Sequence, residues 1–316
     1  MHHHILIIGL FLAAGCSMNS DMLKNEHEIG ELKWRLSDDG TFTISGNGAL
    51  PDFYYEDKVY GKEVNLPPWE PYRDNITKLV VGDGVRHIGT FAFYRCTNLT
   101  SVTIGKAVTS IGREAFDMCL SLTEIVNYQE IPQEIFEGSY QGEVFGVFGH
   151  INKSLCTLFV PAGSIEKYRT DRRWKGFYRM GVIGDPGSIK IEGEWEGITW
   201  TLSDEGVLTF GGADCFPGRS SPISAPWYRL PWANFRNSIT QIEISKGIKE
   251  IGNFVFDECD GVRKFINYRE IPQTVDDMTF WGVGQYTLLV PEGSVEAYRT
   301  ADGWKDFINI EAIKAE

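Results

Sequence analysis

The sequence predicts a mainly β solenoid built from two tandem units, each a short stack of coils. Three observations predict it: a 23-residue segment recurs along the chain, its apolar residues keep fixed positions, and the second half of the chain repeats the first. The segment Ile76–Asn98 is followed at once by a second copy, Leu99–Ser121, and a third copy spans Ile239–Gly261. A repeat of about this length is typical of coils that stack on one another and share one core.

Six positions of the repeat hold apolar residues in all three copies. Between Leu99 and Ile104 apolar and polar residues alternate, which is the period of a short strand that buries one face. One such strand has nothing to pack on, so the copies must stack and align these positions as columns of a continuous core. The columns are Leu79, Val102, Ile242; Val81, Ile104, Ile244; Val85, Val108, Ile248; Ile88, Ile111, Ile251; Phe93, Phe116, Phe256; and Cys96, Cys119, Cys259.

A glycine follows the apolar isoleucine of each copy, at Gly89, Gly112 and Gly252. Glycine accepts a tight bend or a positive φ without the steric cost that a side chain brings. We therefore expect the coil to turn at these three positions.

The two halves of the chain match segment by segment, and the difference in residue number between matching segments, the offset, changes once along the chain. Later segments match at a smaller offset than early ones, and the difference between the two offsets equals the length of one repeat. The first unit is therefore expected over 29–184 and a second, shorter unit over 185–316, with Gly184–Ser188 as the linker. The matching pairs are Trp34–Ile44 with Trp200–Phe210, Pro68–Phe93 with Pro231–Phe256, and Phe116–Gln133 with Phe256–Gln273.

Each unit begins and ends with a segment that closes the stack. An Asp-Asp-Gly turn within Leu36–Phe42 predicts an N-terminal β-hairpin cap over the first coil. A Val-Pro strand and a short helix, with Ser164 or Ser294 as its N-cap, are expected as the C-terminal cap. Six tryptophans are expected as large apolar plugs at these ends: Trp34, Trp69, Trp174, Trp200, Trp232 and Trp304.

The N-terminus resembles the signal peptide of a bacterial lipoprotein. The apolar run Ile5–Leu12 is too short to span a bilayer and leads to small residues ahead of Cys16. The resemblance implies removal of residues 1–15, a lipid anchor on Cys16 and a polar tether over 16–28. Ala13 stands where leucine is usual, and histidines replace the usual basic residues, so ordinary signal-peptidase cleavage or added histidines are the alternatives.

Composition and charge narrow the classes of partner. The chain has 316 residues, 42% of them apolar, which is enough to build real cores. Its net charge is −13 and its pI is about 5.0. Nucleic acids and anionic lipid surfaces require clustered Lys and Arg, so neither is an expected partner, and the only membrane contact we expect is through Cys16.

The sequence lacks the motifs of common catalytic and metal sites. There is no GxSxG, HExxH or phosphate-binding GxxxxGK[ST] motif, and no CxxC or HxxxH spacing for a metal. His150 and Cys156 can be drawn as a catalytic dyad, but a solvated loop histidine and a structural cysteine are the favoured interpretation. We therefore expect no enzyme activity, no cofactor and no metal.

Cysteines occupy one column of the repeat. Stacked coils place equivalent Cα atoms about 4.8 Å apart, which is within range of a disulfide between Cys96 and Cys119. Buried thiols are favoured over that disulfide, because Cys259 holds the same column with no neighbouring copy to pair with.

Three aromatic-rich insertions interrupt the repeats: Asp52–Tyr60, Ile135–Phe148 and Cys215–Arg229. Exposed aromatic side chains beside Gly and polar residues are typical of protein and carbohydrate contacts, whereas aromatics that fold back would only cap the core. The candidate binding residues are Tyr54, Tyr55, Tyr60, Tyr140, Phe145, Phe216, Trp227 and Tyr228.

Together these features resemble the BspA-type leucine-rich-repeat family of bacterial cell-surface proteins. The likeness rests on the Trp-x-Leu-x-x-x-Gly hairpins at Trp34 and Trp200, on the Ile-Gly-x-x-x-Phe-x-x-Cys coils, and on the Val-Pro-x-Gly-Ser caps at Val160 and Val290. It covers nearly the whole chain after Cys16 and implies a leucine-rich-repeat β-solenoid.

The resemblance also implies a function class. It implies an outer-membrane lipoprotein of a Bacteroidetes-like bacterium, on the surface or periplasmic face, with no shared catalytic residues and with relatives that act as adhesins. The expected partner is a host or bacterial surface protein, or a glycan. The alternatives are a carbohydrate-binding accessory lipoprotein of a glycan-uptake system and a structural envelope protein. The acidic run that marks surface export in the family is not clear after Cys16, where Ser17–Asp21 holds a single acid.

Overall fold

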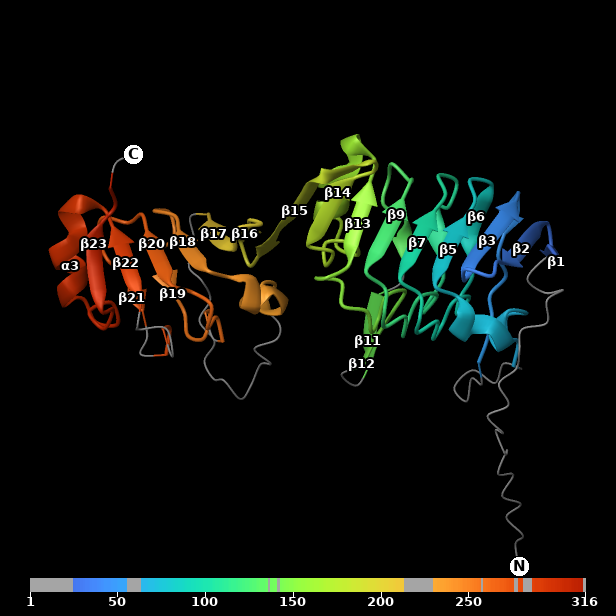
Figure 1. The fold of residues 1–316 in the computed structure, drawn as a ribbon, viewed down its shortest axis with the longest axis horizontal. Helices are drawn as coiled ribbons and strands as arrows, with labels where there is room; N and C mark the ends of the chain where they lie inside the picture. The colour runs from blue at the N-terminus through green and yellow to red at the C-terminus, as the bar shows by residue number, and fades with distance from the viewer. Residues whose placement is uncertain are drawn as a thin grey trace, which may run out of the picture.

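The protein is a β-solenoid in which two stacks of coils share one long sheet (Figure 1). The computed structural model describes residues 25–55, 64–135, 137–140, 143–212, 230–256, 258–275, 278–280 and 286–314. Strands dominate these residues, and their α-helices are two short segments, α2 (Ile165–Thr170) and α3 (Val295–Thr300). No helix in this part of the chain is long and apolar enough to cross a membrane. The mainly β solenoid expected from the repeat is confirmed.

The main sheet has fifteen strands in the described residues, and its strand order follows the chain. In each unit an antiparallel hairpin leads into strands that pair in parallel, as stacked coils require. The earlier strands are β1 (His27–Ile29), β2 (Leu32–Leu36), β3 (Thr41–Gly46), β5 (Lys78–Val81), β7 (Ser101–Ile104), β9 (Glu124–Asn127), β13 (Thr157–Val160) and β14 (Arg179–Val182). The later strands are β15 (Asp185–Trp195), β16 (Ile198–Leu202), β17 (Val207–Gly211), β18 (Gln241–Ile244), β20 (Lys264–Asn267), β22 (Thr287–Val290) and β23 (Asn309–Ala312).

Short strands and single helical turns close the other side of the coils. The register repeats the sequence period, since Lys78 pairs with Ser101, which holds the same position in the next copy. Between Glu124 and Thr157, which also pair, the coil is longer than one repeat, because the insertion Ile135–Phe148 folds there as a hairpin. The short strands are β4 (Gly48–Ala49), β6 (Val85–Ile88), β8 (Ser110–Ile111), β10 (Glu134–Ile135), β11 (Glu137–Tyr140), β12 (Glu143–Gly146), β19 (Glu250–Ile251) and β21 (Thr274–Val275). The 3-10 helices are Glu70–Asn75, Ala162–Ser164, Ala233–Ser238 and Glu292–Ser294.

The six apolar columns lie inside the stacks, as the repeat predicts. Every member of these columns is at most 3% exposed, and all six plug tryptophans are buried as well. The rings of Phe93 and Phe116 stack with centroids 5.7 Å apart, and the indole of Trp69 lies 5.6 Å from Phe93. Ring pairs of this kind add about 0.5–1.5 kcal/mol beyond the burial of their area. The aromatic column therefore ties each coil to the next.

Close approach of the coils, rather than positive φ, explains the glycines at positions 89 and 112. A Cβ at Gly112 would lie 2.3 Å from the Thr90 backbone nitrogen, and one at Gly89 would lie 1.8 Å from the Pro51 carbonyl oxygen. Neither glycine has a positive φ, so that interpretation is wrong for both. The left-handed conformation falls two residues later, at Phe91, where φ is 55°.

The serines ahead of the two α-helices do not cap them. The Ser164 hydroxyl donates to the Glu130 carbonyl oxygen at 2.9 Å and makes no bond to the helix that follows. Ser294 also makes no side-chain capping bond. The expected N-cap role is wrong, because the coil before α2 offers the Ser164 hydroxyl an acceptor that the sequence does not reveal.

Four cysteines in the described residues are buried free thiols, and we refer to them as the buried thiols. The Cys119 thiol donates to the Phe93 carbonyl oxygen at 3.2 Å. Burial raises the pKa of the Cys96 thiol to about 12 and also raises that of Cys119. The preference for thiols over a Cys96–Cys119 disulfide is confirmed. The buried thiols are Cys96, Cys119, Cys156 and Cys259.

The two units meet at a strand that pairs with both. Gly184, with φ of 81°, forms the turn after β14, and β15 then pairs with β14 on one side and with β16 on the other. The segment expected as a linker, Gly184–Ser188, is therefore this turn and the start of β15. The buried apolar residues form two clusters, one ending at Met180 and the other beginning at Ile191. The sheet is continuous across the junction, whereas the core is divided.

Candidate ligand-binding surfaces

The structure describes the side chains of two candidate binding residues, Tyr54 and Tyr55. They follow β4, and the Tyr54 backbone exchanges two hydrogen bonds with Asn65, which close the base of the first insertion. Tyr140 and Phe145 lie on β11 and β12, which belong to a different coil. The other candidates and the expected anchor lie outside the described residues: Tyr60, Phe216, Trp227, Tyr228 and Cys16.

Tyr55 belongs to a half-buried cluster formed by Tyr55, Phe91, Tyr94 and Arg95, which we name the aromatic patch. Its three rings meet edge to face, with centroids 5.1 to 5.8 Å apart. The Arg95 guanidinium lies over the Tyr94 ring, 5.2 Å from its centroid. Each ring keeps part of its surface accessible, and Arg95 is exposed. The aromatic patch can therefore offer ring faces and a cation to a partner.

An ionic pair fixes the position of Tyr55. Its hydroxyl donates to the Glu70 carboxylate, which also accepts from the Arg73 guanidinium at 2.5 Å. Burial, followed by the hydrogen bond to Glu70, raises the pKa of the Tyr55 phenol, so it remains a protonated donor at neutral pH. A partner that reaches the aromatic patch therefore meets a ring whose orientation is already set.

Sequence reasoning identified one ring of the aromatic patch and missed Phe91, Tyr94 and Arg95. These residues lie in the turn of the first repeat, where Phe91 and Arg95 adopt positive φ of 55° and 60°. A usable signal lies in the comparison of neighbouring copies. The positions of Phe91 and Tyr94 are Glu114 and Asp117 in the next copy, so the aromatic pair belongs to one coil and not to the repeat pattern.

One polar cluster on the short strands has the residue types of a catalytic triad. The Ser110 Oγ lies 2.7 Å from His87 Nδ1, and Asp52 Oδ1 lies 3.7 Å from His87 Nε2. In a Ser-His-Asp triad the carboxylate orients Nδ1 and the hydroxyl faces Nε2, so the two ring nitrogens have exchanged roles here. Asp52 Oδ1 accepts the Thr90 N–H at 2.7 Å. We interpret this cluster as a bridge between adjacent coils.

His150 and Cys156, which the sequence allows as a catalytic dyad, each have other surroundings in the structure. His150 Nδ1 lies 2.7 Å from the Asp117 carboxylate, whose same oxygen accepts the His150 backbone N–H at 2.9 Å. Cys156 is one of the buried thiols, and burial raises its pKa to about 12. Among the described side chains, no three or more of His, Cys, Asp or Glu come together in a way that could hold a metal.

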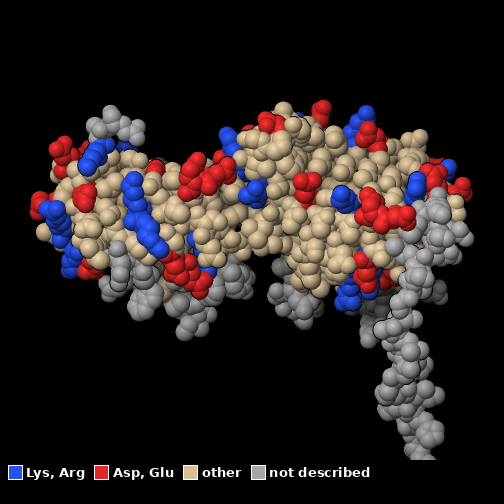
Figure 2. Space-filling view, viewed as in Figure 1, with Lys and Arg blue, Asp and Glu red and all other residues tan. Residues whose placement is uncertain are grey.

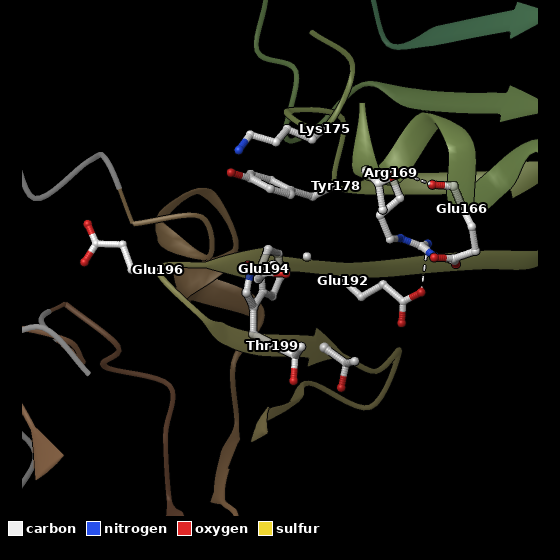
Figure 3. A pocket seen from close by; sticks show the side chains of 12 residues that line it. Glu166, Arg169, Lys175, Tyr178, Glu192, Glu194, Glu196 and Thr199 are labelled. Atoms are coloured by element: carbon white, nitrogen blue, oxygen red, sulfur yellow. Dashed lines mark hydrogen bonds and ion pairs between the residues drawn. The ribbon is translucent and has the colours of Figure 1, made fainter. Parts of the chain in front are cut away.

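A cleft of about 500 Å³ lies where the two units meet, and we name it the junction cleft (Figure 3). Its walls come from α2 and the end of the first unit on one side and from the β15–β16 hairpin on the other. Arg169 of α2 lies 2.6 Å from Glu166, and 2.8 Å from Glu192 of β15, so one guanidinium joins both walls. The side chains of Lys175 and Tyr178 extend side by side along the first wall (Figure 3).

Charged side chains are spread over the face of the molecule shown in Figure 2. Acidic and basic groups alternate there between broad uncharged areas. A face of this kind lacks the clustered cations that bind a phosphate backbone. The aromatic patch and the junction cleft are the candidate binding surfaces among the described residues.

Comparison with known proteins finds a family model similar to the repeats. Residues 72–154 and 232–297 match the family model described as BspA type leucine rich repeat region, in six copies. A comparison with curated proteins gives no match.

Solved structures of leucine-rich-repeat proteins are similar to this chain at low identity. A leucine-rich repeat protein from Eubacterium ventriosum is 17% identical, with 90% of this chain and 83% of that chain covered and a TM-score of 0.31. A leucine rich cell surface protein from Faecalibacterium prausnitzii is 16% identical, with 92% and 96% covered and a TM-score of 0.24. A leucine-rich repeat protein from Bacteroides ovatus is 16% identical, with 92% and 79% covered and a TM-score of 0.21. The family match falls in both stacks of coils, so each of them contains segments similar to the BspA-type leucine-rich repeat.

Proposed function

We propose that the protein is a non-catalytic, lipid-anchored protein of the bacterial cell envelope that recognises a protein ligand through the aromatic patch. Leucine-rich repeats of this type form a scaffold suited to protein binding or adhesion. The anchor at Cys16 and a place at the outer membrane rest on the N-terminal sequence. Membrane fractionation of cells that express a Cys16→Ser variant tests the anchor, and a variant that stays with the membrane argues against it.

The aromatic patch is the observation that carries this proposal. Interfaces between proteins are enriched in aromatic residues and Arg, and Tyr and Arg dominate their energetic hot spots. The patch holds three contacting rings and a stacked guanidinium, contributed by the first insertion and by the turn of the first repeat. Because Tyr55 is already held by Glu70, a partner orders little that was free before, which favours affinity.

The test measures binding of the chain from Asn25 onward to a panel of extracellular-matrix proteins, with a glycan array in parallel. Arg95→Ala removes the stacked cation from the aromatic patch. Met118→Ala is the matched control, because Met118 holds the same position of the next coil with the same φ of 60°. We expect Arg95→Ala to weaken binding to a protein at least tenfold, which is about 1.4 kcal/mol, and Met118→Ala to bind as the native chain does.

The other outcomes separate the alternative functions. Equal losses in the two variants would mean that the aromatic patch is not the contact surface. No binding to any protein or glycan would leave a structural role in the envelope. Binding to glycans alone would favour a carbohydrate-binding accessory lipoprotein.

A further inference from the structure

Beside the junction cleft a glycine lies opposite a tryptophan whose equivalent in the first unit lies opposite a histidine. Trp34 lies opposite His27 in the β1–β2 pair, and the imidazole stacks on the indole at 4.5 Å. Trp200 lies opposite Gly193 in the β15–β16 pair. A Cβ at Gly193 would lie 3.0 Å from Trp200 Nε1 and 2.9 Å from the Tyr178 ring. Because residue 193 has no side chain, the Tyr178 and Trp200 rings meet edge to face, with centroids 5.1 Å apart, at the wall of the cleft.

Trp200 carries a polar atom that has no hydrogen-bond partner among the described residues. Its side chain is 1% exposed, yet its indole Nε1 makes no hydrogen bond to any residue that the structure describes. Trp34 Nε1 is also unpaired, but the His27 ring lies over that indole. At Trp200 the atom lies beside Gly193, and both residues line the junction cleft. A buried N–H favours any acceptor that can reach it, so an oxygen atom entering the cleft gains a hydrogen bond there.

The walls of the junction cleft mix hydrogen-bond donors with acceptors. Arg169 engages Glu166 and Glu192, which reduces the negative charge of that end. Glu194 and Thr199 pair across β15 and β16, line the cleft and are exposed. The remaining excess of carboxylates disfavours anionic ligands such as phosphates or uronic acids. Ring faces beside alternating donors and acceptors match the chemistry of a neutral, hydroxyl-rich molecule.

We propose that the junction cleft binds a short neutral oligosaccharide. The Tyr178 ring packs against the C–H face of one sugar, Trp200 Nε1 donates to a sugar oxygen, and Glu194 accepts from sugar hydroxyls. The cleft volume of about 500 Å³ falls within the range of roughly 300–1,000 Å³ for small-molecule sites. This site is separate from the aromatic patch, so the inference does not depend on the proposed protein ligand.

The test follows the indole N–H signals of the nine tryptophans by NMR while neutral hexasaccharides are added to the folded chain. The probes are cellohexaose, maltohexaose, xylohexaose and mannohexaose. We expect one of them to move the Trp200 signal, assigned with Trp200→Phe, and to leave the Trp34 signal in place. Gly193→Ala, whose Cβ would press on both rings, should weaken binding at least tenfold.

A second test removes one carboxylate of the cleft, and the same change in the first unit is its control. Glu194→Gln should also weaken binding several-fold, whereas Glu28→Gln should not, because Glu28 holds the equivalent register position in the first unit. If Gly193→Ala disturbs the fold, seen as movement of all indole signals, the Glu194→Gln and Glu28→Gln pair decides. The proposal is overturned if no probe moves the Trp200 signal, or if both glutamine variants bind alike. It is equally overturned if a lysine-rich peptide occupies the cleft and the sugars do not.

Discussion

Replacing Gly112 by alanine isolates the packing of one coil against the next. The new Cβ would lie 2.3 Å from the Thr90 nitrogen and 2.8 Å from the Gly89 carbonyl carbon, whereas ordinary contact begins at 3.4 Å. Both neighbours are backbone atoms and cannot rotate away, so the coils must separate locally. Two hydrogen bonds hold the coils here: Gly112 N–H to the Ile88 carbonyl at 2.8 Å and Phe91 N–H to the Arg113 carbonyl at 3.0 Å.

The magnitude follows from these contacts. Two weakened hydrogen bonds at about 1 kcal/mol each agree with the roughly 1–3 kcal/mol that overpacking a well-filled core costs. We therefore expect Gly112→Ala to lower the free energy of unfolding by about 2–3 kcal/mol. At about 2–4 °C per kcal/mol for a domain of this size, Tm should fall by several degrees.

Gly163→Ala is the matched control for this substitution. A Cβ at Gly163 has no atom within 4 Å and the residue has no positive φ, so alanine is accommodated without strain. That variant should be as stable as the native chain, or more stable by up to about 1 kcal/mol, because alanine lowers the entropy of the unfolded state. Thermal unfolding followed by circular dichroism measures both variants. Equal Tm values for Gly112→Ala and Gly163→Ala would refute the close-approach explanation.

Two further predictions concern the thiols and the acid range. The first test uses a chain in which Cys16 and Cys215 are replaced by serine. Its buried thiols should not react with a thiol reagent in the native state and should react fully in denaturant. Labelling without denaturant, or the mass of a disulfide-bonded chain, would contradict the structure. The Arg173 guanidinium, hydrogen-bonded to Asp171, lowers the pKa of that carboxyl below its ordinary 3.8. The resulting stabilisation is present above pH 3.8 and is lost as the pH falls through the folded-state pKa. Asp171→Asn should therefore lower the free energy of unfolding, measured in urea, by about 1 kcal/mol at neutral pH. The difference from the native chain should shrink progressively in the acid range. A difference that stays constant with pH would contradict the assignment.

The core could be predicted from the repeat, because all three copies hold apolar residues at the same positions. Strand alternation within Leu99–Ile104 placed Val102 and Ile104 inward, and both are buried on β7. The hairpin at the Asp-Asp-Gly turn forms as β2 and β3. Local patterns of this kind depend only on residues near one another in the chain, and the sequence displays them directly.

Contacts between coils were not predictable in the same way. Glycine at position 112 has two explanations in the sequence, and only the distance to the preceding coil distinguishes them. The Tyr55 ring lies in an insertion and meets Tyr94 of the first repeat, and no periodic pattern links the two. The need for glycine at position 193 comes from the nearby Tyr178 ring, which belongs to the other unit. Such pairings depend on the three-dimensional path of the insertions, which interrupt the repeat.

The strand shared by the two units also determines how the chain can be divided for experiments. In the described residues the main sheet has two free edges, β1 and β23. A fragment that ends after β14 leaves the unpaired backbone groups of that strand open to other chains, and a fragment that begins at β16 does the same on its own side. A fragment that keeps β15 covers its own last or first strand, but β15 then has one unpaired edge of its own. Any division at the junction therefore leaves a new open strand edge in each fragment, and the full chain is the safer form for binding experiments.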